Sequence, residues 1–359
     1  MNKYFSTISL FFIIIDTGGW SNLRLLGLLF IIVSFILTFN LRLIFKKNID
    51  ILLSFLLMLS VLPSLFFPYI SNQDFSLGLS QVMPIFIFPF LIIIIHLRKR
   101  DYNEIVSLLT TVFSSVIIIF YLLRLFDIGF ANSFAEHLDS AREAGFFDYK
   151  SNLLGIYLPV VYFKPTLLLV PLGLYCLLIN KKSSFLLVMI ALFIAPSRTG
   201  FIVLFLFFGV NYFIRASLFT KLITLTLLFF MVSYISTYID IKNLIFGLSV
   251  RLGHLSSLMD MSFDYESLIF GQGAGTSFFS YGFNAMTDGM ELSQLEYIRR
   301  HGLLSFFFLS LIWAKAAYSN EKWRQPICAY WLVAMSNPVL AVFFSFTFLA
   351  LILSKKTGN

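Results

Sequence analysis

Long apolar stretches alternate with short polar connections along the whole chain. A helix that crosses a bilayer needs about 20 consecutive apolar residues, and stretches near this length recur from one end to the other. No internal repeat at a fixed period accompanies them. The pattern predicts twelve spans, at residues 4–16, 23–44, 49–67, 79–97, 105–126, 153–179, 184–195, 199–214, 218–239, 292–317, 326–336 and 338–354.

Composition supports a membrane protein without a soluble domain. Hydrophobic residues make up 59% of the 359 residues and charged residues 12%, whereas soluble domains carry roughly 25% charged residues. No small-residue cleavage site follows residues 4–15, so we expect an uncleaved first helix. The sequence therefore predicts an all-α, polytopic membrane helix bundle that forms one integral membrane domain over residues 1–359.

The charges divide unevenly between the two sides of the predicted bundle. One side holds 16 cations and four acids; it is made of both termini, the connections at 45–48, 98–104, 180–183, 215–221 and 318–325, and the adjacent span ends with Arg42, Asp50 and Lys315. The other side holds 10 cations and 14 acids. The positive-inside rule places the first side in the cytoplasm, with both termini. The long loops 127–152 and 240–291 then face outward, and the net charge of +8 reflects topology rather than binding to nucleic acid.

The predicted span 153–179 is unusual because three prolines, spaced six residues apart, and Lys164 fall within it. Proline removes a helix hydrogen bond and bends the chain. Either this span is kinked, or residues 153–163 form an interfacial segment and the true span begins near Pro165. The second alternative places Lys164 near the outer boundary, where a charge costs less.

No cofactor or metal site is expected. Cys176 and Cys328 lie in separate apolar runs, which is typical of packing residues. No metal-ligand spacing of Cys and His occurs along the chain.

Five arginines with few nearby partners are predicted on the outer side: Arg124, Arg198, Arg251, Arg299 and Arg300. Arg124 could equally be a snorkelling side chain, and Arg299 and Arg300 could anchor the interface, with a Glu296–Arg300 pair. Arg198 lies in a tight hairpin without an aqueous loop, so we expect it to line a cavity inside the protein. Converging guanidinium groups favour an anion, and at this depth a lipid phosphate or pyrophosphate.

The second outer loop carries two further patterns. Residues 244–259 place apolar residues at helical spacing, with Arg251 and His254 three apart, which indicates an amphipathic helix on the membrane. The stretch 271–275 reads GxGxG but follows no strand of a βαβ unit, so a nucleotide site is not indicated. Its glycines indicate a tight turn or a close approach of backbone to a ligand.

Glu291 has two interpretations. Asp288 and Glu291 show the spacing of a capping box, so Glu291 could cap the helix that follows. Alternatively, a carboxylate without a charge partner at the rim of a cavity is a candidate general base. The sequence offers Glu296 a partner one turn further on and offers Glu291 none.

Four short patterns in this order resemble the O-antigen polymerases (Wzy), within the superfamily that also contains the O-antigen ligases. They are GFFDYKSNLLGIYL at 145–158, SRTG at 197–200, VRLGHLSSLM leading into LIFGQGAG, and ELSQLEYIRRHGLL at 291–304. The first departs from the family at Ser151, where a proline is usual. The resemblance covers most of the chain in architecture.

The resemblance implies roles for individual residues. Arg198 and Arg251 match arginines that bind the pyrophosphate of a lipid-linked donor. Glu291 falls where the ligases have a proposed histidine base, so His254 joins it as a catalytic candidate. Further site candidates are His137 and His301 as alternative bases, Asn152 of the first pattern, and Gly273 of the glycine-rich pattern.

The expected function is a metal-independent glycosyltransferase of a Gram-negative inner membrane, with its active site facing the periplasm. It would polymerise glycan repeat units carried on undecaprenyl pyrophosphate, alongside membrane lipid and, as partners, chain-length regulator and flippase proteins. An O-antigen ligase is one alternative. A lipid-linked oligosaccharide flippase or other transporter is another, although a flippase needs charges along a path open to both sides.

Overall fold

The computed structural model describes residues 3–16, 22–37, 48–70, 75–95, 101–140, 146–153, 156–195, 198–215, 217–218, 221, 241–261 and 264–354. Helices dominate, as the sequence predicts. They are α1 (Lys3–Ile15), α2 (Leu23–Leu37), α4 (Asn48–Ile70), α5 (Phe75–Ile94), α6 (Tyr102–Leu125), α7 (Gly129–Ser140), the 3₁₀ helix η2 (Lys164–Leu168), α8 (Leu169–Leu178), α9 (Lys182–Ile194), α10 (Arg198–Arg215), α12 (Ile241–Asp260), α13 (Tyr265–Phe270), α14 (Ser293–Ser319), α15 (Glu321–Ala334) and α16 (Phe343–Leu353). Two small hairpins complete the fold: β1 (Phe146–Leu153) with β2 (Ile156–Phe163), and β3 (Phe278–Ser280) with β4 (Ala285–Thr287).

Several helices are apolar enough to cross a membrane. Among the described residues, four are also long enough: α4, α5, α6 and α14. Shorter apolar helices lie within or overlap other predicted spans, at 4–15, 23–33, 164–178, 182–194 and 343–353. The predicted span at 218–239 falls almost wholly outside the described residues, as do 38–44 and 96–97. The total of twelve spans therefore stays a prediction.

The structure corrects the sequence prediction at 153–179, which is not one continuous helix. Its first part is strand β2, which pairs antiparallel with β1 from Phe146↔Phe163 to Leu153↔Ile156. The β2 sequence IYLPVVYF is rich in β-branched and aromatic residues, which favour a strand. Helical structure begins only at Lys164, where Pro165 occupies the first turn of η2, a position that tolerates proline. The alternative with a helix start near Pro165 is therefore the correct one.

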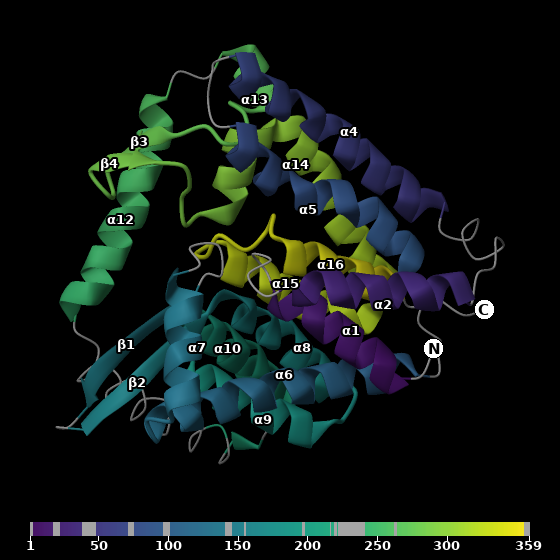
Figure 1. Cartoon of the computed structure of the whole chain (residues 1–359), viewed down its shortest axis with the longest axis vertical. Coiled ribbons are helices and arrows are strands. Elements are labelled where there is room, and N and C mark those ends of the chain that lie inside the picture. Colours follow the sequence, from purple (N-terminus) through teal and green to yellow (C-terminus); the bar gives the residue numbers. More distant parts are fainter. Residues whose placement is uncertain are drawn as a thin grey trace.

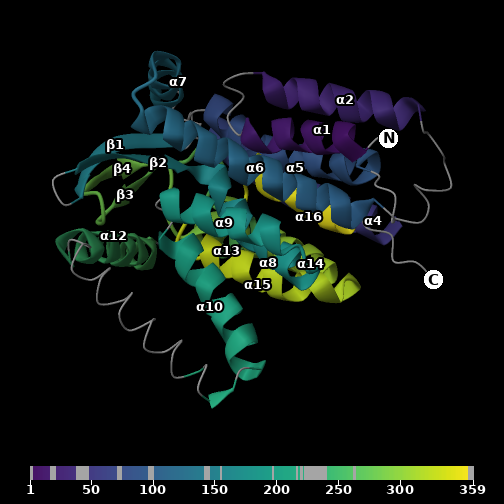
Figure 2. The same cartoon turned by 90° about the horizontal axis from the view of Figure 1, so that it is seen from below.

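The helices form two groups with the C-terminal helices between them. Figure 1 shows α4, α5, α13 and α14 in the upper half, α6 to α10 in the lower half, and α15 and α16 between them. Every residue of α16 is buried, which matches a helix that is apolar on all sides. Figure 2 shows α7 and α10 projecting from opposite sides of this bundle.

Polar and aromatic contacts tie the lower group of helices to the C-terminal helices. The Trp323 indole donates to the Tyr102 hydroxyl at 3.0 Å, and Tyr102 donates to the carbonyl of Leu351 at 3.2 Å. Tyr175 of α8 stacks on Trp323 with 4.0 Å between the ring centroids. These contacts link α6, α8, α15 and α16, so the framework around the C-terminal helices has fixed partners.

The charged residues of α14 lie toward its two ends, and its middle is uncharged. At one end Lys315 pairs with Asp50 of α4, with 2.6 Å between Nζ and Oδ1. At the other end Glu296 pairs with Arg299 and Arg300. Asp50 and Lys315, which the charge pattern assigns to one side, thus meet in space.

Candidate functional site

A break in α14 organises the region where the predicted site residues meet. Gly302 has φ 77° and ψ 171° inside the helix, a left-handed φ that disfavours any residue with a Cβ. The carbonyls of Arg299 and Arg300 are thereby freed from the helix. They accept hydrogen bonds from the backbone N–H groups of Gln272, at 2.7 Å, and Gly273, at 3.2 Å. The glycine-rich segment thus replaces the missing turn of α14.

The glycines of this segment allow the two backbones to touch. Gly271 has φ 87°, and a Cβ there would overlap the carbonyl group of Arg300. A Cβ on Gly302 would in turn overlap the carbonyl of Ile269. The sequence predicted a tight turn or a close approach of backbone to a ligand here, and the group that approaches Gly271 in the structure is the backbone of α14.

Side chains and backbone of α4 and α5 hold this junction. The backbone carbonyl of Ser64 in α4 accepts a hydrogen bond from the N–H of Ala274 at 2.8 Å. The Ser64 hydroxyl shares a 2.9 Å hydrogen bond with Nδ1 of buried His301. Gln81 of α5 accepts the N–H of Gly275 at 2.8 Å. The start of α14 is therefore fixed by groups far away in sequence.

Arg299 is enclosed by protein acceptors. Its Nε and Nη2 donate to the two carboxylate oxygens of Glu296 at 2.9 and 2.8 Å. Nη1 donates to the hydroxyl of Thr276 at 2.9 Å and to its carbonyl at 3.3 Å, and Nη2 reaches the carbonyl of Asp288 at 3.2 Å. The guanidinium also lies 4.7 Å from the centre of the Phe278 ring. All five N–H donors are used by protein acceptors, and Arg299 is 1% exposed, so the described contacts leave it no free donor for a ligand.

Arg300 points elsewhere although it is the next residue. Its Nε pairs with Glu296, as the i,i+4 spacing predicts, and its Nη2 donates to the Asp288 carbonyl at 2.6 Å. Glu296 is thus shared by two arginines. Arg300 keeps partial exposure and lines a cavity.

Glu291 does not cap α14. The helix begins at Ser293, and its N-cap residue, Leu292, makes no side-chain capping bond. Instead Glu291 forms an ion pair with Arg251 of α12, with 3.0 Å between Oε2 and Nε. The expectation that Glu291 lacks a charge partner is therefore wrong. Both side chains remain about one-third exposed, at 35% for Arg251 and 37% for Glu291.

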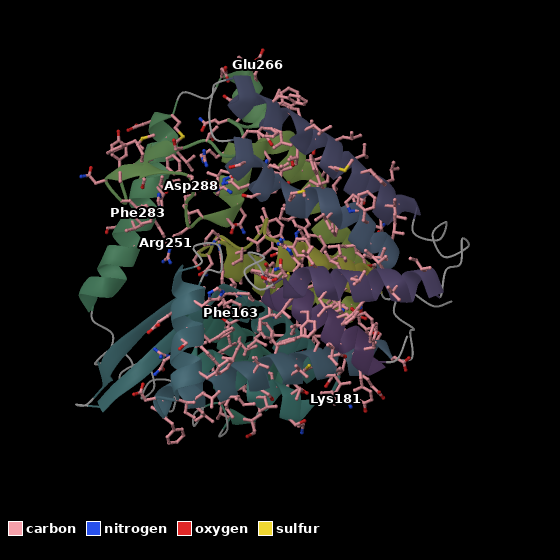
Figure 3. The ribbon with its side chains drawn as sticks, in the orientation of Figure 1. Phe163, Lys181, Arg251, Glu266, Phe283 and Asp288 are labelled. Atoms are coloured by element: carbon pink, nitrogen blue, oxygen red, sulfur yellow. The ribbon has the colours of Figure 1, made fainter. Side chains whose placement is uncertain are left out.

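A cavity of about 330 Å³ lies beside this pair, at the lower end of the size range of ligand pockets. Its charged and polar lining is Lys164, Glu291, Ser293, Glu296, Tyr297, Arg300 and His301, and its apolar lining includes Phe283, Met290, Pro338, Leu340, Ala341 and Val342. The lining joins the two halves of the bundle, because Lys164 comes from the lower group and Arg300 from the upper. Figure 3 shows Arg251, Phe283 and Asp288 between α12 and α14, with Phe163, the neighbour of Lys164, below them.

Hydrogen bonds through Ser336 link the first turn of α10 to Arg251. Helix α10 begins at Arg198, and the hydroxyl of the next residue, Thr199, accepts a 3.3 Å hydrogen bond from Ser336. The carbonyl of Ser336 accepts from Nη2 of Arg251 at 3.4 Å. The side chain of Arg198 lies outside the described part of the structure, as do Pro196 and Ser197 of the predicted hairpin tip.

His254 of α12 is not among the described residues that line the cavity, but its ring contacts the ring of Phe283, which does line it, with 4.8 Å between the centroids. It is fully buried, and its Nδ1 shares a 2.9 Å hydrogen bond with the hydroxyl of Ser280 in β3. Burial lowers the pKa of His254 below its usual value. In this structure it fastens α12 to the β3–β4 hairpin.

Two other candidates, Arg124 and His137, are also not among the described residues that line the cavity. Arg124, at the end of α6, donates to the side chain of Asn132 in α7, and His137 is exposed on α7. Asn152 lies in β1 opposite Tyr157, and its side chain is outside the described residues. Sequence reasoning missed Lys164 and Phe283 as lining residues, although a lone lysine in an apolar stretch was a usable signal.

Among the described residues, no three His, Cys, Asp or Glu side chains gather in a way that could hold a metal ion. No protein-family model, curated protein or solved structure matches this chain. Its function is therefore inferred from the residues around the cavity and from the four sequence patterns.

Proposed function

We propose that this chain is a membrane glycosyltransferase, a polysaccharide polymerase of the O-antigen type. It transfers a glycan from undecaprenyl pyrophosphate to the non-reducing end of another lipid-linked repeat unit. The observation that carries the proposal is the cavity where Glu291, Arg300 and Lys164 meet at one end of a membrane-compatible bundle. A carboxylate, cations and apolar walls at one place suit a substrate with sugar hydroxyls, a diphosphate and a lipid tail.

The proposed reaction is a single displacement at the anomeric carbon. A hydroxyl of the acceptor sugar attacks this carbon, the new C–O bond forms, and the bond to the pyrophosphate oxygen breaks. Glu291 takes the hydroxyl proton as general base. Undecaprenyl pyrophosphate leaves with the bonding electrons, and guanidinium groups stabilise its growing negative charge. The configuration at the anomeric carbon is inverted.

The Arg251–Glu291 pair fits this scheme because it is partly exposed. Ion pairs open to solvent contribute only about 0–1 kcal/mol, so a competing anion can separate them. A diphosphate that binds Arg251 would release the carboxylate of Glu291 as it arrives. The base would then become available when the donor is in place.

The proposed setting is a bacterial inner membrane, with twelve spans, both termini in the cytoplasm and the cavity facing the periplasm. The uneven charge distribution supports this orientation. Membrane lipid surrounds the bundle, and chain-length regulator and flippase proteins are its proposed partners.

Reporter fusions check this orientation. We expect cytoplasmic signals from fusions after Lys47 and Lys182 and a periplasmic signal after Asp264, because the cations concentrate on the side that carries the first two. A periplasmic signal at Lys182 would contradict the topology.

Purified protein and a defined lipid-linked repeat unit test the function directly. We expect a ladder of products that differ by one repeat, with release of undecaprenyl pyrophosphate. Product formation that requires lipid A–core as acceptor would instead indicate a ligase. Movement of the lipid-linked unit across a vesicle membrane without any new glycosidic bond would indicate a flippase.

A further inference from the structure

Lys164 has an unusual environment for a lysine. It begins η2 directly after strand β2, is partly buried and lines the cavity. Within the described part of the chain it forms no hydrogen bond or ion pair. A lysine in such a place normally extends its ammonium group to water or to a carboxylate.

The carboxylates near the cavity already have partners. Glu296 is shared by Arg299 and Arg300, and Glu291 is paired with Arg251. The other cation among the described residues that line the cavity is Arg300. Two cations facing one cavity repel each other unless an anion lies between them.

Arg300 retains capacity for such an anion. Its Nε and Nη2 contact Glu296 and the Asp288 carbonyl, whereas no acceptor among the described residues takes its Nη1. The neighbouring Arg299 is saturated, so the two adjacent arginines have different roles.

The chain around Lys164 fixes its position. Pro165, Thr166 and Leu167 are all buried, and the Thr166 hydroxyl donates to the carbonyl of Phe163 at 2.6 Å. Lys164 is therefore presented from a rigid turn rather than from a flexible loop. A preorganised cation binds an anion with a smaller loss of conformational entropy.

We propose that Lys164 and Arg300 together hold one phosphoryl group, forming an anion subsite at the cavity that is additional to Arg198 and Arg251. The ligand is a phosphate or diphosphate, and its assignment to the lipid-linked donor rests on the proposed function. Lys164 supplies a compact point charge, and Arg300 supplies Nη1 of its planar fork. This subsite explains why a lysine follows directly on β2 within an apolar stretch.

Binding of inorganic pyrophosphate to the full-length protein in detergent tests the subsite. Lys164→Met keeps the apolar stem and removes the charge, and we expect its affinity to fall about 10- to 100-fold, as for loss of one charge-assisted hydrogen bond. Lys164→Arg is expected to stay within about threefold of the parent, because it keeps the charge that holds the anion. Lys181→Gln is the matched control, since Lys181 is exposed and lies at the far corner of the molecule in Figure 3.

Competition experiments separate the two sources of the phosphoryl group. If undecaprenyl pyrophosphate in nanodiscs displaces bound pyrophosphate far better than nanodiscs of phosphatidylglycerol alone, the subsite recognises the donor headgroup. If free pyrophosphate displaces the bound pyrophosphate as well as undecaprenyl pyrophosphate in nanodiscs does, the subsite recognises a soluble diphosphate. Unchanged pyrophosphate affinity in Lys164→Met, at matched thermal stability, would overturn the subsite. If Lys164→Met does not fold, a loss in Lys164→Arg as large as 100-fold would also overturn it.

The two proposals fail separately. Pyrophosphate binding that depends on Lys164, in a protein that makes no polymer, would leave the subsite standing and overturn the polymerase. Normal polymer formation by Lys164→Met, with unchanged pyrophosphate affinity, would overturn the subsite and leave the polymerase standing.

Discussion

Glu291→Gln is expected to lower the initial rate of polymer formation by roughly 10²- to 10⁴-fold, the range typical for loss of a general base. Glutamine has nearly the same size, and its amide oxygen can still accept a hydrogen bond from Arg251. The variant therefore loses the proton acceptor while it keeps the contact between α12 and the start of α14. Because α14 needs no side-chain cap at this position, no folding defect is expected.

Initial rates with a defined lipid-linked repeat are the suitable measurement, since many turnovers hide a partial defect in the final ladder. Glu266→Gln is the matched control, because Glu266 is an exposed carboxylate on α13 at the edge of the molecule in Figure 3. Thermal stability of both variants should equal that of the parent. A rate for Glu291→Gln within about threefold of the parent would exclude it as base, and His301, which lines the cavity, would be tested next.

The apolar helices of this fold were predictable because each one corresponds to a continuous run of apolar residues in the sequence. The β1–β2 hairpin was not, because an apolar run such as residues 156–163 fits a buried strand or a helix equally well. The prolines of the predicted span 153–179 were the only local signal: Pro159 lies within β2, and Pro165 marks the start of helical structure.

The candidate site was predictable in its members but not in its pairs. The ion pair between Arg251 and Glu291 joins residues 40 positions apart, and only the tertiary fold, which brings α12 next to the segment before α14, creates it. The local capping-box spacing around Glu291 pointed to the wrong partner. Arg299 and Arg300 are adjacent, yet they point about 100° apart on a helix, so one enters the protein and the other faces the cavity. Nothing in the sequence indicates which of the two arginines is buried and which faces the cavity.

Arg299→Ala and Arg251→Ala are expected to fail in different ways, although the sequence places both arginines in the same class. Arg299 is buried and holds Glu296, Thr276 and the Asp288 carbonyl at once. Removing it leaves buried acceptors without donors, and breaking a buried ion pair costs on the order of 3–5 kcal/mol. The Arg300 contact to Glu296 offsets part of this loss, so we expect a clear fall in thermal stability and in the amount of folded protein.

Arg251 stands in a partly exposed ion pair, whose loss costs about 0–1 kcal/mol. Arg251→Ala should therefore keep the melting temperature of the parent and lose pyrophosphate affinity and polymer formation. Arg251→Lys should recover little of either, because an ammonium group does not reproduce the planar fork of a guanidinium. Thermal unfolding in one detergent, read beside pyrophosphate binding, separates the two outcomes. An Arg299→Ala protein as stable as the parent but unable to bind pyrophosphate would show that Arg299 serves the ligand, and that its buried contacts with Glu296 and Thr276 do not hold the fold.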